Sequence, residues 1–191
     1  MPGNAPLRGI CGGLWALLFL GWLSDCQPAA AAEQVASKEY QIKAAFLYNF
    51  TKFVEWPIEK FPGTNSPIVI GVLGGDSFAS ALAETIKGRK VNGREIWLQQ
   101  VNTVSEVKGL HVLFVAGSDS KRFGDLEETI KESSVLAVGE SEEFFKLGGA
   151  IVFVLEENKV RFEIDMNSAE RSKLKISAQL QRLARTVKRK L

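Results

Sequence analysis

A single histidine, His111, is the residue with the most obvious chemical potential in this chain of 191 residues. Imidazole chemistry needs partners, either a nucleophile beside it for a catalytic dyad or further histidines for a zinc site. Cys11 and Cys26 belong to an N-terminal segment that we expect to be removed, and no serine stands in a nucleophile-elbow motif. The sequence therefore predicts a structural histidine at the start of a strand, and it predicts no catalytic residue, metal site or cofactor.

The glycine-rich stretch Gly71–Asp76 (GVLGGD) lies between a predicted strand and a predicted helix, where phosphates bind in many α/β proteins. It does not match G-x-G-x-x-G, and no Gly-Lys-Ser/Thr follows it. Asp76 is expected to cap the helix, so that its carboxylate would repel an anion from the helix N-terminus. A structural turn is the favoured interpretation, and a nucleotide site is the alternative.

Arg161, Glu163 and Asp165 form an alternating charged series in the stretch RFEID. Because side chains on a strand alternate between two faces, these three lie opposite the apolar residues of segment 160–164. One interpretation is a cross-strand ladder of ion pairs, which contributes little to stability. The other is a polar surface that recognises a ligand or a partner.

Five aromatic rings crowd residues 44–57 (AAFLYNFTKFVEWP). Helical spacing predicts a helix over about residues 38–55, and its buried stripe is expected to be Ile42, Ala45, Phe46, Phe50 and Phe53. Asn49 falls inside the stripe and is expected to hydrogen-bond a buried group. Tyr48 and Trp56 lie off the stripe, and both are candidate ligand- or partner-binding rings, since Tyr and Trp are enriched at interfaces.

The C-terminal segment is basic, because from Arg171 to Leu191 it has eight Lys or Arg and no acidic residue. Its pattern predicts a long closing helix with one apolar face, made of Ile176, Leu180, Leu183 and Val187. Lys175 belongs to the basic face. That face is either a favourable charge distribution near a helix C-terminus or a surface for an acidic partner or anionic lipid. Nucleic acid is not an expected partner, since the rest of the chain has no basic excess.

The elements that must position these residues alternate along the chain. Short β-branched runs are followed by amphipathic stretches, and AIVFVLEENKVRFEID, residues 150–165, has the pattern of a hairpin. We predict a single α/β domain with a mostly parallel sheet and a C-terminal β-hairpin, covered by helices, with long N- and C-terminal helices.

Residues 1–32 have the order of a secretory signal peptide: one basic residue, an apolar run, then small residues ending in an Ala-x-Ala match. The apolar run is too short to span a bilayer comfortably. We therefore expect a mature domain of residues 33–191 in the periplasm. The alternative is acylation of Cys26, which follows a lipoprotein-like LSD and would tether the protein to a membrane.

Several segments together resemble the YfiR family: YQIKAAFLYNFTKFVEWP, PIVIGVLGGDSF, VNGREI, HVLFV, GGAIVFVLEENKVRFEID and LKISAQLQRLAR. The resemblance spans about residues 39–185. It implies an exported α/β protein of Gram-negative bacteria that tends to form a homodimer. The namesake is a periplasmic repressor that binds the sensor part of an inner-membrane diguanylate cyclase, and an outer-membrane lipoprotein can sequester it.

One departure concerns cysteine. Members related to the namesake have disulfide cysteines, one of them just before the strand HVLFV, where this chain has Leu110. The mature chain is therefore expected to lack any disulfide.

Two functions from different classes follow. The first is a non-enzymatic periplasmic regulator that binds and represses a membrane signalling protein, a diguanylate cyclase or a histidine kinase. The second is a periplasmic protein that binds or senses a small aromatic or anionic ligand, motivated by the GVLGGD turn and the rings of Tyr48 and Trp56.

Overall fold

The computed structural model describes residues 28–189. Most of the predicted signal segment, residues 1–32, lies outside this range, and so do Cys11 and Cys26 and hence the acylation hypothesis. The described chain begins with a long helix, α1 (Pro28–Phe53), so the alanines of the predicted cleavage site are helical. No helix in residues 28–189 is both long enough and apolar enough to cross a membrane.

Parallel strands form the centre of the main sheet. Their spatial order is β4 (Arg94–Gln100), β2 (Ile68–Leu73), β5 (Val112–Val115), β6 (Leu136–Gly139) and β7 (Ile151–Glu156). Antiparallel strands flank this centre: β3 (Lys90–Val91) next to β4, and β8 (Lys159–Asp165) next to β7. The predicted α/β class, with a mostly parallel sheet and a C-terminal hairpin, is confirmed.

Two short additions complete the strand pairing. β10 (Thr186–Lys188) runs parallel to β8 at one end of the main sheet. A separate two-stranded pair joins β1 (Val54–Glu55) to β9 (Lys175–Ile176) and so connects the end of α1 to the C-terminal segment.

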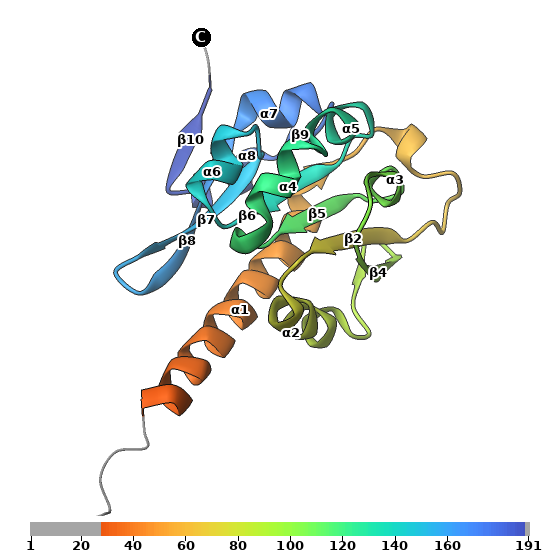
Figure 1. Cartoon of the computed structure of the whole chain (residues 1–191). Coiled ribbons are helices and arrows are strands. Elements are labelled where there is room, and N and C mark those ends of the chain that lie inside the picture. Colours follow the sequence, from red (N-terminus) through yellow and green to blue (C-terminus); the bar gives the residue numbers. More distant parts are fainter. Residues whose placement is uncertain (1–27, 190–191) are drawn as a thin grey trace, which may run out of the picture.

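Helices cover both faces of the sheet (Figure 1). One face packs against α1, α2 (Asp76–Ile86), α7 (Met166–Arg171) and α8 (Ala178–Leu183). The other packs against α3 (Val104–Val107), α4 (Ser120–Gly124), α5 (Glu127–Glu132) and α6 (Glu142–Lys146). Two 3-10 turns, η1 (Ile58–Lys60) and η2 (Gly117–Asp119), lie in connections between elements.

The strands are apolar on both sides because both faces are covered. All four residues of β5 are buried, and Phe114 stacks on Phe78 of α2 with ring centroids 3.7 Å apart. Leu113 and Val115, on the other side of the same strand, belong to the cluster under α4 and α6. Leu110, just before this strand, is fully buried.

The long N-terminal helix is present, but the predicted buried stripe on it is partly wrong. Phe50 is fully buried against Phe162, with ring centroids 5.0 Å apart, whereas Ile42 and Ala45 are exposed. Asn49 is exposed as well, and its side-chain oxygen accepts from Lys52 at 3.2 Å. α1 packs against both α2 and the β7–β8 hairpin, so its buried arc is centred on other residues: Ala44, Leu47, Tyr48, Phe50 and Thr51.

The predicted long C-terminal helix is wrong. The segment forms α7, β9, α8 and β10 in succession, and Lys173 has a positive φ of 57° just after α7. Ser177 ends the β9 pairing and caps α8, because its hydroxyl accepts from the amide of Leu180. Pairing with β1 and β8 supplies hydrogen bonds that a continuous helix would forgo, so only Ile176 and Leu180 of the predicted apolar face are buried.

Candidate functional site

The sheet has a topological switch point between β2 and β5. The next strands along the chain, β3 and β4, lie on one side of β2, whereas β5, β6 and β7 lie on the other side. In open α/β sheets, ligands bind in the crevice outside the carboxyl ends of the strands at such a point. The loops after β2 and β5 are therefore the first place to search for a binding site.

The loop after β2 contains Gly74 and Gly75, which both have left-handed backbone conformations (φ 72° and 67°). A Cβ atom at Gly74 would collide with the carboxylate of Asp119, which comes from the loop after β5. Gly75 is the N-cap residue of α2, and no side chain caps this helix. The prediction that Asp76 is the cap is therefore wrong, because Asp76 is already the first helical residue.

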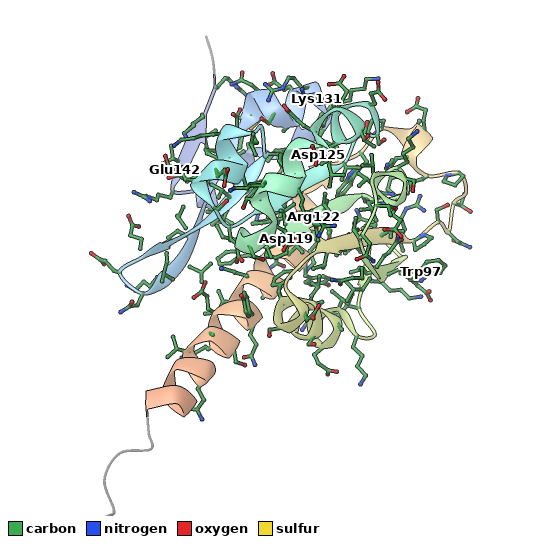
Figure 2. The ribbon with its side chains drawn as sticks, in the orientation of Figure 1. Trp97, Asp119, Arg122, Asp125, Lys131 and Glu142 are labelled. Carbon is green, nitrogen blue, oxygen red and sulfur yellow. The ribbon has the colours of Figure 1, made fainter. Side chains whose placement is uncertain are left out.

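Asp119 and Arg122 form the charged centre of this edge, and Figure 2 shows them beside each other in front of the sheet. Arg122 donates to Asp119 Oδ1 at 2.8 Å and to the carbonyl of Asn102 at 3.2 Å. Hydrogen bonds from Ser118 and Arg122 lower the pKa of Asp119. A hollow of about 320 Å³ lies next to this pair, between the ends of β2 and β4 and the helix α4, and Leu73, Asn102, Arg122 and Asp125 are among its lining residues.

The chemistry of this edge differs from that of a nucleotide site. The carboxylate of Asp119 occupies the space in front of Gly74 and would repel a phosphate there. Arg122 is already neutralised by the same carboxylate. Within residues 28–189, no group of His, Cys, Asp or Glu side chains is arranged to hold a metal ion. The geometry agrees with a structural turn at GVLGGD and leaves a small polar-rimmed hollow beside it.

A buried lysine joins α1 to the same edge. Lys43, which is 7% exposed, lies 2.6 Å from Glu140 Oε2 and 2.5 Å from Glu39 Oε1. The other oxygen of Glu140 accepts from the amide of Gly117 at 3.0 Å. Burial lowers the pKa of Lys43, but the hydrogen bonds to Glu140 and Glu39 outweigh it and raise the pKa overall. Sequence analysis missed this network, since an acidic residue after a strand gives no hint of its partner on a distant helix.

His111 lies at the opposite, amino edge of the sheet and is 3% exposed. Its Nδ1 accepts from the amide of Val69 at 3.1 Å, so the proton of the neutral ring is on Nε2, which has no hydrogen-bond partner. Phe61 stacks on the ring with centroids 4.7 Å apart, and Trp56 donates from its indole to the His111 carbonyl at 3.0 Å. Burial, together with the charges of Lys60 and Arg94, lowers the pKa of His111 to about 4.

Three of the six predicted binding residues come from β8, and the structure brings them onto one strand as expected, with Arg161 exposed and the other two partly buried. Each is engaged differently. Asp165 caps α7 by accepting from the amides of Asn167 and Ser168, and Glu163 lies 3.6 Å from Arg185. Arg161 is therefore the most available of the three.

The other three predicted residues come from other elements: Tyr48 from α1, Trp56 from the residue after β1, and Lys175 from β9, the strand that pairs with β1. Trp56 is half-buried against His111, and Lys175 is exposed on β9, where it pairs in register with Glu55. Tyr48 is only 8% exposed, so the prediction that its ring lies outside the packed face of the helix is wrong. Its hydroxyl donates to the carbonyl of Lys90, the first residue of β3, at 3.4 Å.

Two solved structures are similar to part of this chain. The chain is similar to a conserved domain protein from Vibrio cholerae O1 biovar El Tor, with 11% identity and a TM-score of 0.46, over 63% of this chain and 54% of that one. It is also similar to an ABC domain in complex with L-Trp from Streptococcus pneumonia, with 11% identity and a TM-score of 0.45, over 69% of this chain and 58% of that one. The chain thus spans little more than half the length of each.

A search of curated proteins found no match. A family model does match, the DUF4154 model described as YfiR/HmsC-like, over residues 40–185. This range runs from the middle of α1 through α8 and includes every strand of the parallel centre. The chain belongs to the YfiR/HmsC-like family.

Proposed function

We propose that this chain is a non-enzymatic periplasmic regulator that binds and represses a membrane-bound signalling protein, a diguanylate cyclase, and thereby modulates cyclic-di-GMP. The observation that carries the proposal is the family match over residues 40–185, since the resemblance to YfiR implies this role. The signal segment of residues 1–32 and the mature domain of residues 33–191 are part of the proposal. So are a homodimer and sequestration by an outer-membrane lipoprotein.

The side chains with catalytic potential in residues 28–189 have structural partners, which favours binding over catalysis. His111 is held between Trp56 and Phe61 and is inaccessible to a substrate. The hydroxyls of Ser120 and Ser141 are 2.6 Å apart, and neither has a histidine beside it that would act as a base.

The exposed charges of Arg161 on β8 and of Lys175 on β9 provide two positions to test first. Arg161 and Lys175 form no ion pair among the described residues, so their charges are available to a partner. Trp56 and Asp165 are poorer test positions, because each makes a hydrogen bond on which local structure depends.

The test is complementation of a deletion strain, with cyclic-di-GMP measured by mass spectrometry. We expect the deletion to raise cyclic-di-GMP, the natural chain to restore it, and Arg161→Glu or Lys175→Glu to restore it less well. Lys173→Glu, an exposed lysine in the turn before β9, is the matched control. An unchanged cyclic-di-GMP level in the deletion strain would reject the cyclase as the target. A histidine kinase would then be the partner to test.

The second candidate function, binding of a small ligand, is favoured by one observation. The hollow of about 320 Å³ lies at the carboxyl edge next to the switch point and has Asn102, Thr103, Arg122 and Asp125 on its rim. A thermal-shift screen of amino acids, organic acids and aromatic solutes tests it. A ligand that stabilises the natural chain but not Asp125→Ala would support it, and a screen without any stabilising solute would reject it.

A further inference from the structure

Strand β4 has an open edge. Its residues 96–100 pair with β2 on one side, whereas β3 on the other side reaches only Arg94 and Glu95. Among residues 28–189, no other segment forms a backbone hydrogen bond to 96–100 on that outer side. The outward N–H and C=O groups of this stretch are thus free to pair with a further strand.

This edge lacks the features by which proteins protect open strands. Residues 96–100 (IWLQQ) contain no proline, no lysine and no charged side chain. Trp97 is 56% exposed, and Figure 2 shows it at the outer rim of the molecule beside β4. The opposite end of the sheet differs, because its edge strand β10 has only three residues and includes Lys188. A long uncharged edge with an exposed Trp is suited to recognition by strand addition.

Basic side chains gather where the open edge begins. β3 pairing ends at Lys90 opposite Glu95, and Arg89 and Lys87 come shortly before Lys90 in the chain, where the open stretch begins. The guanidinium of Arg89 lies 5.0 Å from the Tyr48 ring centroid, and the ammonium of Lys52 lies 4.1 Å from it.

These cations lack acidic partners. None of Lys52, Lys87, Arg89 and Lys90 forms an ion pair with a carboxylate in the described part of the chain. The acid of the neighbouring strand, Glu95, instead accepts a hydrogen bond from the Trp97 indole at 3.4 Å. Two cations held at one ring repel each other, and an external anion would relieve that repulsion.

We propose that an extended, acidic segment of a partner protein adds as a strand to the open edge of β4, with its acidic side chains at Lys87, Arg89 and Lys90. The open edge supplies main-chain hydrogen bonds, Trp97 supplies apolar contact, and the basic cluster selects the charge of the segment. This inference rests on the proposed function in one respect, because it assigns the segment to the regulated membrane protein. The surface itself is tested without that protein.

The probe is a set of blocked seven-residue peptides in which Val, Ile or Thr alternates with Glu, together with the same set with Lys in place of Glu. Hydrogen exchange of the natural chain is measured by mass spectrometry with and without each peptide. We expect Glu peptides to slow exchange in the segment that contains 96–100 and Lys peptides to have no effect. Added salt is expected to weaken the protection, because the charges are exposed.

Two variants and one control sharpen the test. Arg89→Glu is expected to weaken binding of the Glu peptides about fivefold, the size of one exposed charge interaction of about 1 kcal/mol. Trp97→Lys places a charge on the edge and is expected to abolish protection of 96–100. The control Lys159→Glu makes the same change in net charge as Arg89→Glu, but on β8. In the sheet, β8 is separated from β4 by β2, β5, β6 and β7. We expect this variant to bind the peptides as the natural chain does.

Three results would overturn the proposal: equal binding of Glu and Lys peptides, protection elsewhere than 96–100, or no protection by any Glu peptide. A fourth is self-association of the chain that Trp97→Lys abolishes, measured by light scattering, since the occupant would then be a second copy. None of these results depends on cyclic-di-GMP, so a failure here is distinguishable from a failure of the proposed regulatory function.

Discussion

Each edge of the parallel sheet holds a lysine away from solvent, fully for Lys43 at the carboxyl edge and partly for Lys60 at the amino edge, and the two edges stabilise the charge in different ways. At the carboxyl edge, Lys43 lies between two carboxylates, Glu39 and Glu140, which raise its pKa despite burial. At the amino edge, Lys60 donates, within residues 28–189, only to the carbonyls of Lys108 and Ser133, at 2.9 and 2.6 Å, and burial lowers its pKa to about 8. Neutral carbonyls satisfy the hydrogen bonds of an ammonium but do not cancel its charge.

The neighbours of the two lysines differ in the same way: they are charged at the carboxyl edge and largely aromatic at the amino edge. Glu140 also binds the amide of Gly117, so charge at the carboxyl edge ties α1 to the loop after β5. His111 at the amino edge lies among aromatic rings with an unpartnered Nε2. We therefore expect the carboxyl edge to depend on a charged network for stability, and the amino edge to lose stability when its buried histidine takes up a proton.

Removal of the Lys43 charge is expected to have the largest effect. Lys43→Met leaves two carboxylates without their buried cation and should lower the free energy of unfolding by about 4 kcal/mol, measured by urea denaturation. Lys38→Met, on the exposed part of the same helix, is the control and should change it by less than about 0.5 kcal/mol. If Lys43→Met costs no more than its control, the network does not stabilise the carboxyl edge.

A second variant tests that network as a unit. The double change Lys43→Met with Glu140→Gln removes the orphaned charge as well as its partner. It should therefore recover part of the stability that Lys43→Met loses. Purely additive losses would show that the two side chains act independently.

Acid should weaken the amino edge through His111. Its folded pKa of about 4 lies below its ordinary value of 6.5, so the unfolded state binds a proton first as the pH falls. The contribution of neutral His111 to the free energy of unfolding is fully present above pH 6.5. It is lost as the pH falls from 6.5 to 4, by up to about 3 kcal/mol. His111→Asn keeps an acceptor for the Val69 amide and removes the titration. The difference between the two stability curves over this pH range should therefore isolate His111, and parallel curves would contradict the prediction.

Lys60 should titrate at a pH at which Lys43 does not. NMR of ¹³C-labelled lysine side chains is expected to show a midpoint near pH 8 for Lys60, whereas the midpoint of Lys43 is expected above the ordinary lysine value of 10.5. Because the folded pKa of Lys60 is below its unfolded value, stability should rise between pH 8 and 10.5, and Lys60→Met should remove that rise. Equal midpoints for the two lysines would show that the edges do not differ in this respect.

The ion pair of Arg122 is expected to matter least. Its side chain is 49% exposed, so Arg122→Ala should lower the free energy of unfolding by only about 0.5–1 kcal/mol. Lys121→Ala, the exposed neighbour that forms no ion pair in the described residues, is the control. A loss as large as that expected for Lys43→Met would mean that the carboxyl edge depends on its exposed charges as well.

The local sequence pattern was sufficient to predict secondary structure where the conformation of an element depends on its own residues. The β-branched runs predicted β2, β5 and β6, and alternation along residues 160–164 correctly placed Phe162 inside and Arg161 outside. The sequence pattern gave the wrong prediction where helix and strand are similarly favourable for the local residues. The C-terminal segment has helical periodicity, but β1 and the edge of β8 offered it strand partners from distant parts of the chain.

The sequence by itself determined the α/β class, the parallel core with its hairpin and the family, because each depends on residue type and short-range spacing. Only the tertiary structure decided which arc of α1 is buried, that Lys43 meets Glu140, that Tyr48 is enclosed and that the edge of β4 is open. These depend on which elements lie side by side. That outcome is set by the packing of the whole chain, and no local stretch of residues encodes it.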